Sequence, residues 1–180
     1  MINFIAFVLA FFAGLLVKWV DWLDDDEKSK SPLKYVLALA YGLLIGYLIS
    51  TASFGEAFLG ALLAQVFARK VDTTAHMLGF AVAVLALPFF GFPPADILFI
   101  AYFFLLAFMD EDAFGARFSL FEGHRPILEL GALLLLLIGR WDYAAGILLF
   151  DIGYLLLGTC MRSKAAEKKQ VNKKTSRQRA

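Results

Sequence analysis

Long apolar runs separated by short polar segments make up most of the chain. Seven runs stand out, at residues 2–20, 34–51, 54–69, 75–92, 95–109, 126–140 and 143–161. They are apolar at odd and even positions alike, whereas the strands of a membrane barrel alternate at every second residue. A helix satisfies its own backbone polar groups inside lipid, and about 20 apolar residues are enough to cross it. The pattern predicts an all-α bundle of seven transmembrane helices.

The polar segments predict the orientation of this bundle. The connections on one side are short, at residues 50–53, 91–94 and 140–142, and those on the other side are longer, at 21–33, 70–74 and 110–125. Of the 17 Lys and Arg residues, all except Arg140 fall on the long-loop side. Because basic loops stay in the cytoplasm, we expect a multi-pass protein of the cell membrane with its N-terminus outside and its C-terminus inside.

Composition supports lipid as the main surroundings of the chain. Of its 180 residues 61% are hydrophobic, whereas a soluble domain has about 45–50%. We expect one transmembrane domain, residues 1–161, and a basic cytoplasmic tail, residues 162–180, that is disordered and drawn to anionic headgroups. Membrane lipid, and not nucleic acid, is the expected partner.

A short pattern recurs where three odd-numbered helices are expected to end. An apolar residue followed by Asp closes each of them, at Asp21, Asp72 and Asp110. This favours three helix hairpins plus a closing seventh helix, although a pattern this short also arises by chance. The sequence Gly42-Leu-Leu-Ile-Gly46 indicates close packing of the second helix against a neighbour.

Acidic residues gather on the side that holds the basic ones, although the orientation rule does not require this. Asp21, Asp24 and Asp25 have the spacing of one helix face, which suits Mg²⁺, a cation that takes carboxylates and keeps waters for a phosphate to replace. The alternative is a hydrophilic loop neutralised by Lys28 and Lys30. The full set of predicted metal ligands is Asp21, Asp24, Asp25, Asp72, Asp110 and Asp112.

His76 lies about one turn inside an apolar run, where a polar side chain is costly. Asp72 is four residues earlier, so an Asp–His pair that binds metal or moves protons is one interpretation. The other is that Asp72, Thr73 or Thr74 caps the helix and His76 is merely hydrogen-bonded within the bundle.

The segment from residue 110 to 129 combines acids, an imidazole and guanidinium groups. His124 and Glu129 are candidate acid–base groups beside His76, and Lys70, Arg117 and Arg125 are candidate phosphate ligands because Arg suits bidentate phosphate contacts. Alternatively, Arg125 and Glu129 pair with each other at a spacing of four residues.

Asp151 is the acid expected deepest in the membrane, roughly 12–15 Å from either end of the last helix. A carboxylate there costs about 2.5–3.5 kcal/mol even on lenient scales, so it must face the bundle interior. It is the fourth candidate catalytic residue. The alternative is a structural hydrogen bond to one of four residues on neighbouring helices: Tyr41, Tyr47, Tyr102 or Ser50.

Three functions fit these features. The first is an integral membrane enzyme that acts on a lipid-linked, phosphorylated or isoprenoid substrate at the cytoplasmic face, as a Mg²⁺-dependent transferase or hydrolase. The second is a small ion or solute transporter or channel that uses Asp151 at the midplane. The third is a structural membrane subunit. The sequence has no P-loop, nucleophile elbow, HExxH or CxxC motif that would select a reaction.

Overall fold

The computed structural model describes the backbone of residues 4–26, 31–92, 95–111 and 125–178, and the side chains of the same residues except 25–26 and 164–178. This part of the chain contains α-helices and no strands, which confirms the all-α prediction. Its helices are α1 (Phe4–Asp21), α2 (Leu33–Ile49), α3 (Gly55–Phe67), α4 (Thr74–Phe90), α5 (Ile97–Glu111), α7 (Pro126–Leu134) and α8 (Trp141–Gln178), with a π-helical turn, Trp22–Asp26, after α1 and a 3₁₀ turn, Leu135–Ile138, after α7.

Two of these helical segments are long and apolar enough to cross a membrane, Phe4–Asp24 and Trp141–Ser163. Helices α2, α3 and α4 are apolar but shorter, as is the segment Pro126–Ile138. The predicted apolar runs therefore coincide with helices, of which two have the length and apolarity expected of the seven predicted spans.

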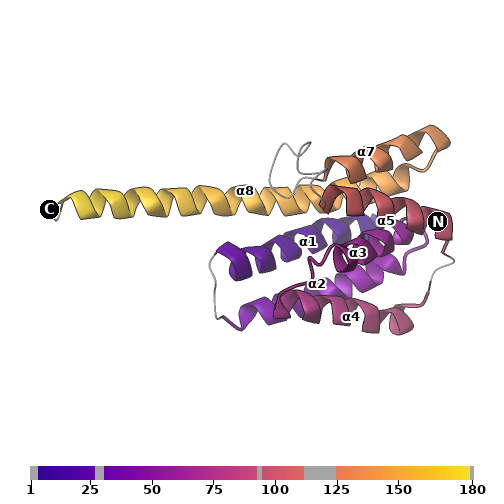
Figure 1. The fold of residues 1–180 in the computed structure, drawn as a ribbon, viewed down its shortest axis with the longest axis horizontal. Helices are drawn as coiled ribbons and strands as arrows, with labels where there is room; N and C mark the ends of the chain where they lie inside the picture. The colour runs from indigo at the N-terminus through magenta and orange to yellow at the C-terminus, as the bar shows by residue number, and fades with distance from the viewer. Residues whose placement is uncertain (1–3, 27–30, 93–94, 112–124, 179–180) are drawn as a thin grey trace.

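Successive helices run in opposite directions between the two ends of the bundle (Figure 1). Asp21 at the end of α1 contacts His76 at the start of α4, and Glu56 at the start of α3 contacts Tyr143 near the start of α8. We call these ends the His76 end and the Arg140 end. The His76 end holds Lys18, Asp21, Asp24, Lys34, Thr73, His76, Asp110, Glu111, Arg125 and Tyr154; the Arg140 end holds Ser53, Glu56, Asp96, Arg140, Asp142 and Tyr143.

The most extensive packing joins helices that are not neighbours in sequence: α1 with α8, α2 with α4, and α3 with α5. Each of these pairs is parallel, because each places residues from corresponding ends together. The hairpins expected from the recurring Asp pattern do not dominate the packing. The reason is that glycine and alanine seams, rather than the loops, select the partner helices.

The backbones of α1 and α8 approach each other closely where the two helices cross. A Cβ at Gly14 would lie 2.0 Å from the carbonyl oxygen of Phe150, and one at Gly153 would lie 2.2 Å from that of Phe11. The predicted close packing at Gly42 and Gly46 is confirmed, since Cβ atoms there would lie 2.5 and 2.8 Å from carbonyl oxygens of α4.

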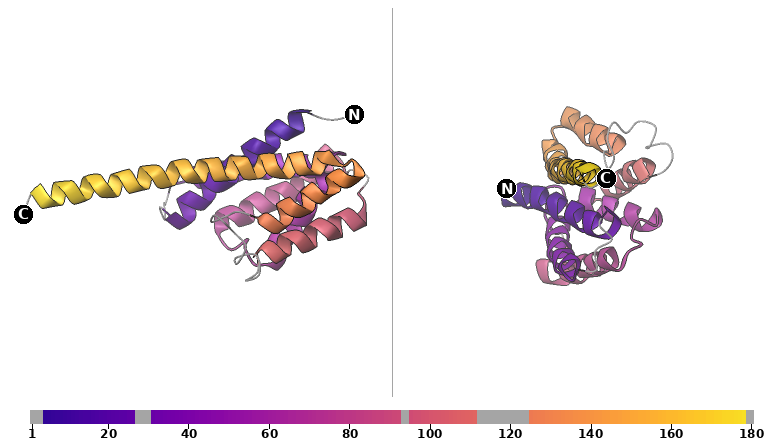
Figure 2. Two further views of the ribbon diagram at one scale, coloured as in Figure 1. Left: turned by 90° about the horizontal axis from the view of Figure 1, so that it is seen from above. Right: turned by 90° about the vertical axis from the view of Figure 1, so that its left-hand side faces the viewer.

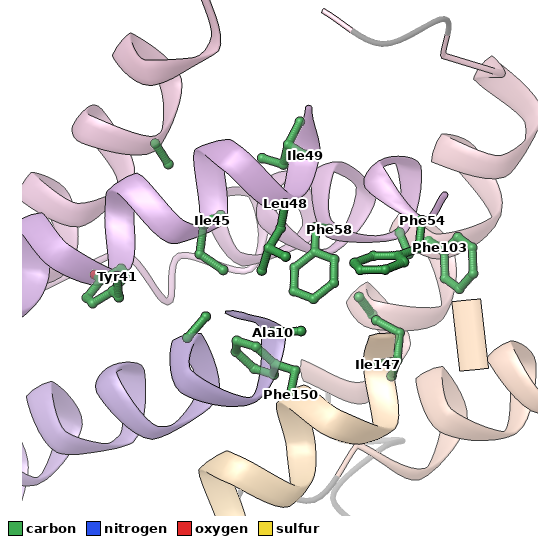
Figure 3. Close-up of a cluster of buried hydrophobic side chains, with 14 of the residues drawn as sticks. Ala10, Tyr41, Ile45, Leu48, Ile49, Phe54, Phe58, Phe103, Ile147 and Phe150 are labelled. Atoms are coloured by element: carbon green, nitrogen blue, oxygen red, sulfur yellow. The ribbon is translucent and has the colours of Figure 1, made fainter. Parts of the chain in front are cut away.

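Aromatic side chains fill the centre of the bundle, and the periphery is apolar as well. Phe54 and Phe103 are fully buried beside Phe58 and Phe150 (Figure 3). The outer surface carries many large apolar side chains, with exposed fractions up to 88% at Phe89. A soluble protein rarely exposes apolar groups on this scale, so another apolar medium or partner must cover them.

Helix α8 continues past the bundle as a single helix to Gln178 (Figure 2). We had expected residues 162–180 to lack regular structure because they show no apolar periodicity. The segment is rich in Lys, Arg and Ala, which have high helix propensity. Propagating a helix that the bundle has already nucleated also costs less than starting a new one.

Candidate functional site

The His76 end is organised around a contact between an acid of α1 and an imidazole of α4. The Nε2 atom of His76 lies 2.9 Å from Oδ1 of Asp21. Thr73 is the N-cap of α4, and its hydroxyl accepts a hydrogen bond of 3.3 Å from the backbone N–H of His76. This cap fixes the first turn of α4 and so places the imidazole opposite the end of α1.

The second ring nitrogen of His76 faces a phenol from α2. Its Nδ1 atom lies 3.1 Å from the hydroxyl of Tyr41, which is buried. The ring of Tyr41 can reach this position because residue 79 is glycine: a Cβ there would lie 2.2 Å from the Tyr41 hydroxyl oxygen. Asp21, His76 and Tyr41 therefore form a continuous acid–imidazole–phenol chain across three helices.

Asp21 has two further partners. Its Oδ2 atom accepts a short hydrogen bond from the hydroxyl of Tyr154 on α8, and Lys18 lies 4.0 Å from the same oxygen. The ammonium of Lys18 also lies 5.0 Å from the centre of the Tyr154 ring. The carboxylate is thus held in one orientation from both sides.

Asp24 lies in the π-helical turn that follows α1, a type of distortion that is frequent at functional sites. One of its oxygens accepts a hydrogen bond from the ammonium of Lys34, and the other accepts one of 2.8 Å from Thr73. Asp21 and Asp24 therefore approach α4 side by side but bind different partners, His76 and Thr73.

Two acids at the end of α5 organise the entry to α7. Asp110 accepts hydrogen bonds from the backbone N–H groups of Ile127 and Leu128 at 3.0 and 2.7 Å, which satisfies the first turn of that helix. Burial raises the pKa of Asp110 above its ordinary value, and these two N–H groups offset only part of the effect. The recurring Asp at this position thus acts as a helix cap.

Glu111 gathers three partners at the same end. Its carboxylate lies 3.5 Å from Arg125 and 3.7 Å from Lys70, and it accepts a hydrogen bond from Gln65. Burial disfavours the charged guanidinium of Arg125, but the negative charges of Glu111 and Asp151 outweigh it and raise its pKa. Arg125 therefore lies between the Glu111 cluster and the interior acids.

Asp151 belongs to this end of the bundle rather than to an isolated position. It is 4% exposed, lies within hydrogen-bonding range of Glu129, and feels the charges of Arg125 and Asp110. It is one helical turn from Tyr154, which contacts Asp21. Its Oδ2 atom has no hydrogen-bond partner among the described residues.

Three of the four hydroxyl groups that the sequence offers as partners for Asp151 are bound to other groups. Tyr41 contacts His76, Tyr102 donates to the carbonyl oxygen of Gly131 at 2.9 Å, and Ser50 donates to that of Gly46 at 3.0 Å. Each of these hydroxyls reaches a group on its own or an adjacent helix before it can reach α8.

The Arg140 end contains a second polar network. Arg140 binds both carboxylate oxygens of Asp142, at 3.1 and 3.0 Å, and donates to the carbonyl oxygen of Ser53 at 2.9 Å. Its guanidinium lies 4.3 Å from the centre of the Tyr143 ring, and Tyr143 donates to Glu56 at 3.1 Å. The hydrogen bonds to Asp142 raise the pKa of Arg140 even though burial works against its charge.

The structure separates the predicted site residues into groups. Asp21, Asp24, His76, Asp110 and Arg125 lie at the His76 end, and Lys70 reaches it through Glu111. Glu129 and Asp151 lie close to each other and near the charges of Arg125 and Asp110. Asp72 is exposed. Arg117, His124, Asp112 and the side chain of Asp25 lie outside the described residues. Among the described residues, no three His, Cys, Asp or Glu side chains are arranged to hold a metal ion.

The predicted pairing of His76 with Asp72 does not match the structure. His76 pairs with Asp21, because Thr73 caps α4 and leaves Asp72 exposed. Arg125 contacts Glu111 of α5, and Glu129 lies near Asp151 of α8. Contacts between helices therefore join these residues.

The sequence analysis named Tyr41 only as an alternative partner of Asp151, and it did not identify Tyr154 or Lys34 as residues of the site. A signal for Tyr154 was present, since it is three residues from Asp151 and so lies near it on α8. A buried phenol also needs a hydrogen-bond partner, which makes any Tyr inside an apolar helix a candidate.

Comparisons of this chain with models of known protein families, with curated proteins and with solved structures found no match.

Proposed function

We propose that this chain is a seven-span membrane enzyme that acts on a lipid-linked, phosphorylated substrate, with the His76 end as its acid–base site at the cytoplasmic face. The observation that carries the proposal is the chain of Asp21, His76 and Tyr41, which comes from three helices far apart in sequence. A bundle needs no such arrangement to pack.

The geometry suits proton transfer. Asp21 orients the imidazole through Nε2 and stabilises the imidazolium that forms when Nδ1 accepts a proton. The Tyr41 hydroxyl lies 3.1 Å from Nδ1. A proton from the reacting hydroxyl or water would therefore reach the imidazole ring through Tyr41. Tyr154 restricts Asp21 to this orientation.

The surroundings suit a phosphorylated lipid. Lys18, Lys34, Lys70 and Arg125 supply positive charge at this end, and a phosphate would compete with the carboxylates that now pair with them. The exposed apolar sides of the bundle fit lipid chains and account for the seven predicted spans. Mg²⁺ is part of the proposal, with Asp24 as a ligand that exchanges Lys34 and Thr73 for the ion while Asp21 keeps its contact with His76.

The test uses the full chain in lipid nanodiscs and a polyprenyl diphosphate, with the matching polyprenol as the unphosphorylated control. We expect the diphosphate, with Mg²⁺ present, to raise the unfolding temperature and the polyprenol to leave it unchanged. We also expect Asp21→Asn and His76→Gln to abolish release of phosphate or diphosphate. Asp142→Asn, at the opposite end, should retain both properties.

Failure of every phosphorylated lipid to stabilise the wild-type chain would overturn the proposal. So would full turnover by both the Asp21→Asn and His76→Gln variants, because the acid–base pair would then play no part in the reaction.

A transporter is the second candidate, and one observation favours it: Asp151 is a buried carboxyl with an unpartnered oxygen inside the bundle. Such residues often mark ion pathways. Ion or proton flux in liposomes that is abolished by Asp151→Asn and unaffected by His76→Gln would support this candidate over the enzyme.

A further inference from the structure

Asp151 is unusual because one oxygen of its buried carboxyl group has no hydrogen-bond partner in the described part of the chain. The residue is 4% exposed, and its Oδ2 atom makes no hydrogen bond to any described residue. A buried oxygen of this kind costs about 1–3 kcal/mol when left without a partner. Glu129 of α7, another carboxyl, lies within hydrogen-bonding range of Asp151.

The charged groups around this pair are largely committed elsewhere. Asp110 accepts the N–H groups at the start of α7, and Glu111 binds Arg125 and Lys70. On the α1 side, Tyr154 donates to Asp21. Arg125 is the cation whose charge reaches Asp151, and it also pairs with Glu111.

We propose that Asp151 and Glu129 form a proton-binding site between α7 and α8, in which one proton is held between the two carboxyl groups. Two carboxylates in contact repel each other, and one proton converts that repulsion into a hydrogen bond. The proton also supplies a donor where the surroundings of Asp151 offer too few.

A proton fits this site better than a metal ion. A metal needs several oxygen ligands around one point, and the described residues contain no group of three acidic, His or Cys side chains arranged in that way. The proton-binding site does not depend on the reaction proposed at Asp21 and His76.

The test is infrared difference spectroscopy of the full chain in lipid nanodiscs, in which a protonated carboxyl group gives its own C=O stretching band. We expect the wild-type chain to show this band at neutral pH and Asp151→Asn to lose its full amplitude. Glu129→Gln should shift or remove the band, because the partner that shares the proton has changed. Asp142→Asn is the matched control, since Asp142 is already paired with Arg140, and should leave the band unchanged.

Three results would overturn this inference. They are the absence of the band in the wild-type chain, its persistence at full amplitude in Asp151→Asn, and its loss on addition of Na⁺ or Ca²⁺ at constant pH, which would identify a metal-ion site. Asn can still donate to Glu129, so Asp151→Asn should fold, and circular dichroism checks this directly. No lipid substrate is used, so failure here is distinguishable from failure of the proposed enzyme.

Discussion

The two ends of the bundle use the same kinds of side chain in different ways. At the Arg140 end, one guanidinium binds one carboxylate through two hydrogen bonds and also closes a loop through Ser53. At the His76 end, ionisable groups from six helices meet: an imidazole bonded on both nitrogens, two phenols, two Asp–cation pairs and a pair of carboxyls. The network at the Arg140 end links neighbouring helices, and the network at the His76 end brings titratable groups into contact.

The two ends of the bundle also differ in the length of their connections. The network at the Arg140 end involves few residues, and the connections between helices at that end are short. The groups at the His76 end come from helix termini on both sides of long connections, so they meet only when the whole bundle is assembled.

The largest expected effect comes from the α1–α8 crossing, on which both ends depend. Gly153→Ala would place a methyl group 2.2 Å from the carbonyl oxygen of Phe11, so the two helices must separate. We expect a loss of about 2 kcal/mol in unfolding free energy, measured by thermal unfolding in detergent. Gly158→Ala is the control, because its Cβ would meet only the flexible end of Lys18, at 3.3 Å. Equal stability of the two variants would refute this account of the crossing.

An intermediate effect is expected at the Arg140 end. Arg140→Ala removes the two hydrogen bonds to Asp142 and the hydrogen bond to the carbonyl oxygen of Ser53. The Arg140 side chain is 35% exposed, so solvent weakens its ion pair with Asp142. We expect a loss of about 1–2 kcal/mol, together with faster hydrogen exchange at residues 53–56 and 140–143. Phosphate release at the His76 end should remain. A variant that is stable but inactive would contradict the separation of roles between the two ends.

The smallest effect on stability is expected within the candidate site. Tyr154→Phe removes one hydrogen bond to Asp21 and should cost about 1 kcal/mol, while lowering turnover more than Arg140→Ala does. The comparison variant is Lys70→Ala, whose side chain is 53% exposed and should show no measurable change in unfolding temperature. If Tyr154→Phe were fully active, orientation of Asp21 by this phenol would not matter to the reaction.

The sequence predicted the helices, and it placed most candidate residues on one side of the bundle, because hydropathy and charge are local properties. It did not predict which helices pack together. The choice of α4 for α2 depends on Gly42 meeting Gly79, and that of α8 for α1 on Gly14 meeting the backbone of α8. His76 found Asp21 instead of Asp72 for the same reason: helical spacing identifies neighbours within a helix, whereas the site is made of contacts between helices.

The length of helix α8 beyond its crossing with α1 would enlarge any change in the crossing angle. It crosses α1 at Gly153 and continues as one helix to Gln178, about 38 Å further along at 1.5 Å per residue. A change of about 10° in the crossing angle would therefore displace its far end by roughly 7 Å. Because Asp151 and Tyr154 lie beside the pivot, a rearrangement of the polar groups at the His76 end would be transmitted, enlarged, to the basic C-terminal segment.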